Sequence, residues 1–179
     1  MNTLADAWRW YEDSKKSLKL IHRLGEKHWL KLSTESLTVL RHDDRFRQLE
    51  PQDITGPAKN ALKELDDLAI VVMFSVFEGI VRDRILDEIN PEKSLLRHQS
   101  LISAADDAIA AIGTGSFFHV LAPFRRGFPS LSEEVDQVRE YRNWVAHGKR
   151  SKCKHQVDPG AAFDRLSRFL EATVKPSIA

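Results

Sequence analysis

Cysteine is nearly absent from this sequence, and no hydrophobic stretch is long. Cys153 is the single cysteine among 179 residues, which excludes a disulfide within the chain and a zinc site made of several cysteines. The longest apolar run, from Leu68 to Phe77, is interrupted by Ser75 and stopped by Glu78. It is shorter than the ~20 residues of a membrane-spanning helix. The N-terminus also lacks the basic and then apolar pattern of a signal peptide. We therefore expect a cytoplasmic protein without a membrane segment.

An excess of charge of one sign is missing as well. Lys and Arg number 27, Asp and Glu number 26, and the formal net charge is +1. Such a balance gives no general attraction to nucleic acid, so any basic surface must be local. One segment has that local bias, because the residues from Tyr141 to Val157 include five Lys or Arg and no acid.

Motifs for metals and cofactors are also lacking. The sequence has no glycine-rich phosphate loop and no Ser-His-Asp pattern that predicts a catalytic triad. His22, Glu26 and His28 offer two possible ligands one turn apart, but the sequence identifies no third ligand. We expect neither a bound metal nor a cofactor.

What the sequence does contain is helical periodicity. Hydrophobic residues make up 42% and charged residues 30% of the chain, which is ordinary for a soluble globular protein. The length predicts one domain over residues 1–179, and no segment shows the alternation of a strand. The fold class is therefore predicted to be all-α, an up-and-down helical bundle of about four to six helices. The predicted helices cover residues 3–25, 33–41, 58–89, 103–112, 130–148 and 158–174.

Local sequence patterns set the expected helix ends. Thr3 and Asp6 have the spacing of a capping box at the start of the first helix. Residues 41–53 are polar and are predicted to form a loop. The longest helix is expected to start at residues 55–57 and to end at residues 90–91, where Asn is followed by Pro. It is apolar around most of its circumference, which is typical of a central, buried helix.

The helix over 130–148 is amphipathic, and its ends are marked. Ser130 or Ser132 is expected to cap its start, and Gly148 to end it. Apolar residues recur along it at steps of three and four residues, as on a helix that faces the core. This stripe consists of Leu131, Val135, Val138, Tyr141 and Val145.

An arginine, a side-chain amide and a histidine lie within six residues at the end of this helix. At ~100° per residue, Arg142 falls inside the apolar stripe. A guanidinium there must be paired, and the candidate acid is Glu78, a lone carboxylate in the apolar part of the long helix. Asn143 and His147 share a neighbouring face, with Arg139 one turn earlier. The sequence therefore predicts a cluster of polar groups at the C-terminal end of this helix.

Two segments of the chain resemble the HEPN superfamily. Arg142-Asn143-x3-His147 resembles the R-x4-6-H motif, and the segment from Phe74 to Glu78 resembles the second core helix of these domains. The resemblance implies a small helical bundle that cleaves RNA without a metal, as a toxin or a defence effector. An antitoxin or inhibitor protein would then be a further partner.

The resemblance implies a role for each residue of the cluster. In such a reaction an RNA 2′-hydroxyl attacks the adjacent phosphate, His147 exchanges protons, and Arg142 binds the phosphate. Asn143 orients His147 or the ribose, and Glu78 supports Arg142. Flanking phosphates are assigned to Arg139, Lys149, Arg150 and Lys152. The reaction needs both a base and an acid, and a homodimer would supply a second His147.

Simpler interpretations remain for each of these residues. A histidine before a helix-ending glycine often only interacts with the C-terminal carbonyls. Arg142 and Glu78 would also form a purely structural pair. The alternative function is therefore a catalytically silent HEPN-like module that dimerises and binds RNA, a nucleotide or a partner protein.

Overall fold

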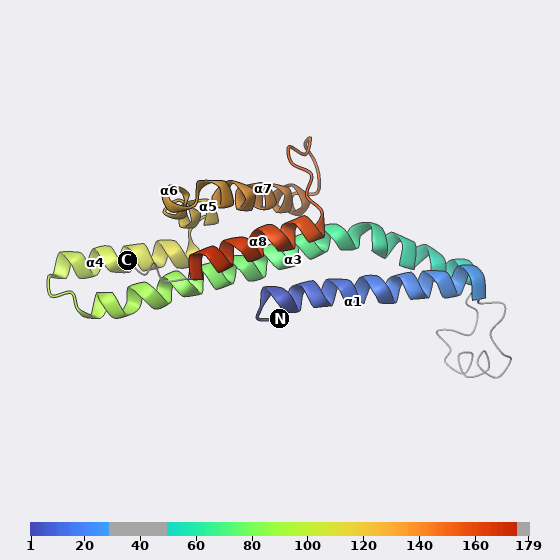
Figure 1. Ribbon diagram of the computed structural model, residues 1–179, viewed down its shortest axis with the longest axis horizontal. Coiled ribbons are helices and arrows are strands. Elements are labelled where there is room, and N and C mark those ends of the chain that lie inside the picture. The colour runs from blue at the N-terminus through green and yellow to red at the C-terminus, as the bar shows by residue number, and fades with distance from the viewer. Residues whose placement is uncertain (29–49, 175–179) are drawn as a thin grey trace. The chain divides into compact units, whose positions relative to one another are not determined.

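The structure, a computed structural model, describes residues 1–28 and 50–174. Within these residues the chain is helical and contains no β-strand, which confirms the predicted all-α fold (Figure 1). The predicted helix over 33–41 and residues 41–49 of the predicted loop lie outside the described residues, while residues 51–53 of that loop are helical. The helical elements are α1 (Leu4–Arg23), the π-helical turn η1 (Leu24–His28), α3 (Pro51–Ser94), α4 (Gln99–Thr114), α5 (Phe117–Leu121), α6 (Phe124–Gly127), α7 (Pro129–Ala146) and α8 (Pro159–Val174).

The chain forms two compact units. The first combines Met1–Trp8 with Ala69–Ala179, and the second is Arg9–Leu68. Every residue that the sequence assigns to the candidate site belongs to the first unit. A compact unit is not by itself a separate domain, so the single domain over residues 1–179 stays a prediction.

The longest helix, α3, extends further than the sequence predicts at both ends. It begins at Pro51 rather than at residues 55–57, and it continues to Ser94. At the start, the Asp53 carboxylate accepts a hydrogen bond from the Glu50 backbone N–H at 2.8 Å. Pro91 lies inside the helix because a proline near a helix end removes only one backbone hydrogen bond. Within residues 1–28 and 50–174, neither α3 nor any other helix is long and apolar enough to cross a membrane.

The part of α3 in the first unit is the core element that its composition predicts. Ile70, Met73, Phe74 and Phe77 are fully buried there. The Phe77 ring packs edge-on against Phe169 of α8, with ring centroids 5.6 Å apart. Phe117 at the start of α5 and Leu166 of α8 are also buried. The core of this unit is therefore built from α3, α5, α7 and α8.

An ion pair joins helix α4 to α3, and the half-buried residues of α4 are apolar. The two helices lie side by side in Figure 1, and Lys93 of α3 forms an ion pair with Asp106 of α4. No residue of α4 is buried. The helix is longer than the predicted 103–112 and ends at Thr114. The segment from Gly113 to Ser116 then leads into α5, and this segment contributes to the candidate site.

Helix α7 starts earlier than expected, and neither predicted serine caps it. Phe128 is its N-cap residue and makes no side-chain cap hydrogen bond, while Pro129 occupies the first turn. Proline favours that position because its fixed φ suits a helix and its missing N–H would be unpaired there. Ser132 therefore lies inside the helix, where it is buried, and its hydroxyl has no hydrogen-bond partner among the residues that the structure describes.

Other predicted helix ends are confirmed. Thr3 and Asp6 bond to each other's backbone N–H at 3.2 and 3.1 Å, as in a capping box. Asp158 caps α8 by accepting a hydrogen bond from the Ala161 N–H at 3.0 Å. Gly148 follows the end of α7 with φ +73°, a left-handed conformation that favours glycine.

In the second unit, α1 and the N-terminal part of α3 share one polar contact. The Tyr11 hydroxyl donates a hydrogen bond to the Asp66 carboxylate at 2.8 Å, and Lys15 approaches the same carboxylate oxygen at 2.9 Å. Burial raises the pKa of the Tyr11 hydroxyl, and the hydrogen bond with Tyr11 raises the pKa of Lys15. This contact fixes the register of the two helices within the unit.

Candidate active site

The C-terminal end of α7 is closed by a regular hydrogen-bonding motif. The Gly148 N–H donates to the Val145 carbonyl and the Lys149 N–H to the Trp144 carbonyl, both at 2.9 Å. This pair of bonds is a Schellman motif with a left-handed glycine. His147 is the C-cap residue, and its own N–H donates to the Asn143 carbonyl at 2.9 Å. The N–H groups of residues 147 to 149 are therefore all hydrogen-bonded to the last turn of α7.

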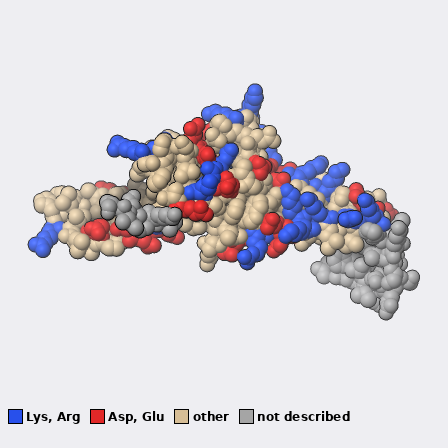
Figure 2. Space-filling model, in the orientation of Figure 1, with Lys and Arg blue, Asp and Glu red and all other residues tan. Residues whose placement is uncertain are grey.

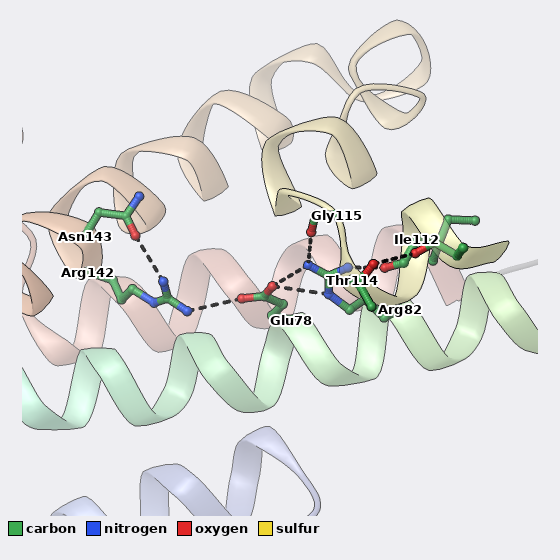
Figure 3. Close-up of polar contacts among 8 residues, drawn as sticks. Glu78, Arg82, Ile112, Thr114, Gly115, Arg142 and Asn143 are labelled. Atoms are coloured by element: carbon green, nitrogen blue, oxygen red, sulfur yellow. Dashed lines mark hydrogen bonds and ion pairs between the residues drawn. The ribbon is translucent and has the colours of Figure 1, made fainter. Parts of the chain in front are cut away.

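Arg142 pairs with Glu78, as the helical phase predicts. Its Nη2 donates to Glu78 Oε2 at 3.2 Å, and its Nη1 donates to Asn143 Oδ1 at 3.0 Å (Figure 3). The guanidinium also lies over the Phe74 ring, 5.3 Å from its centroid. The Arg142 side chain is 28% exposed, so it is half-buried at the rim of the core rather than enclosed.

A second arginine, which the sequence interpretation missed, binds the other oxygen of Glu78. Arg82 donates from Nε and Nη2 to Glu78 Oε1 at 3.2 and 2.6 Å. It also donates to the backbone carbonyls of Ile112 and of Gly115, the latter at 2.8 Å. Figure 3 shows Glu78 between the two arginines, with Arg82 turned toward the end of α4. The i,i+4 spacing of Glu78 and Arg82 is the signal in the sequence that identifies this pair.

Another carboxylate holds a second pair of arginines nearby. Asp136 accepts hydrogen bonds from Arg139 Nε at 2.8 Å and from Arg125 Nη2 at 2.7 Å. Both guanidiniums also lie over the Phe118 ring, at 5.3 and 4.1 Å from its centroid. Arg139, which the sequence assigns to RNA phosphate, is thus partly neutralised. Only its Nε takes part in a described hydrogen bond, so its terminal nitrogens remain as donors.

His147 lies in a pocket of about 360 Å³ between the end of α7 and the loop that follows. The exposed His147 lines it together with Asn143, Arg139 and Trp144. The Trp144 indole N–H donates to the Ser151 carbonyl at 2.6 Å, which holds the loop against the helix. Within residues 1–28 and 50–174, no hydrogen bond or ion pair joins the His147 imidazole. We call this cavity the His147 pocket.

The loop over 149–155 contributes several cations to the His147 pocket. Arg150 and Lys152 line it, as expected for residues that hold flanking phosphates, whereas Lys149 does not. Lys154 and His155 also line it and were missed by the sequence interpretation. In Figure 2, Lys and Arg side chains project from this loop at the top of the view.

His155 brings a second imidazole to the same pocket. Its Nε2 lies 3.8 Å from Glu140 Oε2, so a carboxylate of α7 stands beside it. The sequence shows His155 only as part of a basic run. Its place opposite α7 depends on the path of the loop, which no periodicity encodes.

Arg142 faces a different cavity from His147. This second pocket, the Arg142 pocket, has a volume of about 450 Å³. Arg139 and Asn143 line both pockets, while Arg142 lines only one and His147 only the other. The Arg142 pocket is lined by Phe74, Glu78, Arg82, Arg139, Arg142, Asn143 and the segment from Gly113 to Phe118. The predicted constellation is therefore assembled on one helix but divided between two adjacent pockets.

Asn143 is oriented by Arg142 rather than by His147. Its Oδ1 accepts the hydrogen bond from Arg142 Nη1, which leaves the amide nitrogen as a donor at the boundary of the two pockets. Asn143 is half-buried. The predicted contact between Asn143 and the His147 imidazole does not occur among the described side chains.

Metal-binding groups and similar proteins give no further identification. Within the described part of the chain, no three His, Cys, Asp or Glu side chains are grouped so as to hold a metal ion. His22 approaches Glu26 at 3.5 Å as an isolated pair.

No protein-family model matches the chain, and no curated protein and no solved structure is significantly similar to it.

The contacts of Glu78 predict an order of stability for three substitutions. Glu78→Ala removes the carboxylate that holds two half-buried guanidiniums, so we expect the free energy of unfolding to fall by about 2–4 kcal/mol. Arg142→Ala leaves Glu78 bound to Arg82, and a loss of about 1–2 kcal/mol is expected. The exposed His147 is replaceable by Ala within about 0.5 kcal/mol. Urea unfolding of the three variants measures these differences.

The exposed Arg126, which lines neither pocket, provides the matched control for the urea unfolding measurements. Arg126→Ala should unfold like the wild type. A Glu78→Ala protein as stable as the wild type would show that the two arginines do not depend on this carboxylate.

Proposed function

We propose that the chain is a HEPN-type endoribonuclease that cleaves RNA without a metal. The observation that supports this most directly is the His147 pocket, where an imidazole lies among Arg139, Arg150 and Lys152 and beside the Asn143 amide. Cleavage by the 2′-hydroxyl needs a group that moves protons near neutral pH and cations that stabilise the crowded phosphate. The residues of this pocket are of these two types.

The proposed reaction assigns one step to each group. His147 removes the proton from the 2′-hydroxyl, and the 2′-oxygen forms a bond to the adjacent phosphorus. The bond from phosphorus to the 5′-oxygen breaks, and an acid protonates that oxygen. The products are a 2′,3′-cyclic phosphate and a 5′-hydroxyl. Arg142 and Arg139 bind RNA phosphates through their planar guanidiniums, and Arg150, Lys152 and Lys149 attract the flanking strand.

The acid has two potential sources. A homodimer of this chain would bring a second His147 to the site, which is the arrangement that the HEPN resemblance implies. His155 of the same chain is the other source, because it lines the His147 pocket. Its Nε2 lies 3.8 Å from Glu140 Oε2, so a carboxylate that could orient the imidazole stands beside it. These two arrangements differ in whether His155 is needed.

The biological setting proposed for such an enzyme is that of a toxin or a defence effector. RNA is the substrate, and a protein antitoxin or inhibitor would restrain the activity. A second candidate function is supported by the division of the site. Since Arg142 is held by Glu78 and lines a different pocket from His147, a silent HEPN-like module that binds RNA would have the same contacts.

We expect the purified protein to cleave RNA in the presence of EDTA and to leave 2′,3′-cyclic phosphate ends. An RNA with a single 2′-deoxyribose at the cleaved position should be inert, because the nucleophile is missing. His147→Ala should lower the rate by at least about 10²-fold, the usual contribution of acid–base catalysis. Gel electrophoresis of end-labelled RNA, with mass spectrometry of the ends, measures each result.

Arg126→Ala is again the control and should cleave like the wild type. Strict dependence on added Mg²⁺, or cutting of the 2′-deoxy substrate, would exclude this mechanism. Full activity of His147→Ala would exclude His147 as the base. RNA binding by the wild type without any cleavage would leave the silent module as the function.

The source of the acid is tested by His155→Asn. If His155 is the acid, this variant loses about 10²-fold in rate and the alkaline limb of its pH–rate profile changes. If the acid is His147 of a second chain, His155→Asn keeps its rate, and the activity per chain falls on dilution as the homodimer dissociates. Rate measurements across pH and protein concentration, with light scattering for the oligomeric state, separate the two arrangements.

A further inference from the structure

The Arg142 pocket has unused hydrogen-bond donors directed at a cavity. Arg82 is nearly saturated, because its nitrogens already bond to Glu78 and to two carbonyls. Among residues 1–28 and 50–174, Arg142 donates only to Glu78 and Asn143, and Arg139 only to Asp136. A guanidinium has more donors than these bonds consume. In this pocket Arg82 is therefore held in place, whereas Arg142 and Arg139 can each bind another acceptor.

The charge of the pocket favours an anion. Its lining holds Arg82, Arg139 and Arg142 but only one acid, Glu78. Both oxygens of that carboxylate are already used by Arg82 and Arg142, so it keeps the arginines in place. A planar guanidinium that is already oriented loses little entropy when it binds phosphate oxygens.

The rest of the lining includes a backbone segment beside Arg82 and an aromatic ring. The segment from Gly113 to Ser116 gives a backbone wall with little side-chain bulk, and a Cβ added at Gly113 would meet no atom within 4 Å. Phe118 lines the same pocket and is 39% exposed. The guanidiniums of Arg125 and Arg139 lie over this ring, so Phe118 holds two cations at the edge of the pocket.

We propose that the Arg142 pocket binds the RNA phosphate next to the scissile one. This inference rests on the proposed function, in which the scissile phosphate lies at His147. Because Arg139 and Asn143 line both pockets, a strand crossing them enters one pocket directly after the other. Arg142 then sets the register of the strand and does not contact the reacting phosphate. Losing Arg142 should raise KM more than it lowers kcat, whereas losing His147 should lower kcat.

The test pairs a change in the RNA with a change in the protein. A short RNA whose cleavage position has been mapped is made with a 2′-deoxyribose at that position, so that the full-length protein binds without cutting. A methylphosphonate then removes the charge from one linkage at a time. Binding is measured by fluorescence anisotropy for the wild type, for Arg142→Gln and for the control Arg126→Gln.

We expect that neutralising one linkage adjacent to the scissile one weakens binding by on the order of tenfold in the wild type and in Arg126→Gln. The same change should have no further effect in Arg142→Gln, because the partner of that phosphate is gone. Neutralising the scissile linkage should weaken RNA binding by the wild type and by Arg142→Gln equally. Arg142→Lys, which keeps the charge beside Glu78, provides the comparison if Arg142→Gln does not fold.

The proposed subsite would be overturned if Arg142→Gln cancelled the effect of neutralising the scissile linkage, or if it did not cancel the effect at any linkage. Cleavage of unmodified RNA by the wild type would continue in that case. Absence of cleavage of unmodified RNA by the wild type would instead reject the proposed function, and the subsite with it. The two failures are therefore distinguishable in one set of measurements.

Discussion

The structure of the first unit depends on one carboxylate at the edge of its aromatic core. Glu78 follows Phe74 and Phe77 on α3, and these phenylalanines are fully buried. A carboxylate so close to the core is costly unless cations and donors satisfy it. Arg82 and Arg142 do so from opposite sides, one oxygen each. Through Arg82 the carboxylate also fixes the end of α4, and through Arg142 it fixes α7. Three separate segments thus converge on a single acid.

This anchoring determines what Arg142 can do. A guanidinium held by Glu78 and Asn143 is oriented before any ligand arrives, but it is also directed away from the pocket that contains His147. The same ion pair that stabilises the fold therefore separates the arginine from the histidine of the motif. A residue can be structural and still bind a ligand, provided that some of its donors remain unused. Among the described residues Arg142 keeps more unused donors than Arg82.

Two sequence signals predicted the contact between α7 and α3. Helical phase placed Arg142 in the buried stripe of α7, and the lone acid in the apolar run of α3 made Glu78 its candidate partner. The glycine at 148 marked the end of α7. Proline chemistry was misread, since Pro129 and Pro51 begin helices that were expected to start later. The i,i+4 spacing could have predicted the pair of Arg82 with Glu78. The bonds of Arg82 to the carbonyls of Ile112 and Gly115 depend instead on how the chain turns after α4. His155 likewise depends on a loop, and loop paths are set by tertiary contacts that have no period in the sequence.

The candidate site therefore has a rigid part and a part that depends on few contacts. Helix α7 carries Arg139, Arg142 and Asn143, and its C-terminal end is closed by the hydrogen bonds of the Schellman motif. A loop carries Arg150, Lys152 and His155. It is held against that helix by the Trp144–Ser151 hydrogen bond and by contacts of Lys154 and His155 with Glu140. Catalysis requires acid and base groups at fixed positions, whereas phosphate binding tolerates more variation because the charges act over longer distances. The loop thus decides between the two candidate functions: if RNA orders it around His147, the site has the groups of a nuclease, and without that order it retains only the cations of a binding module.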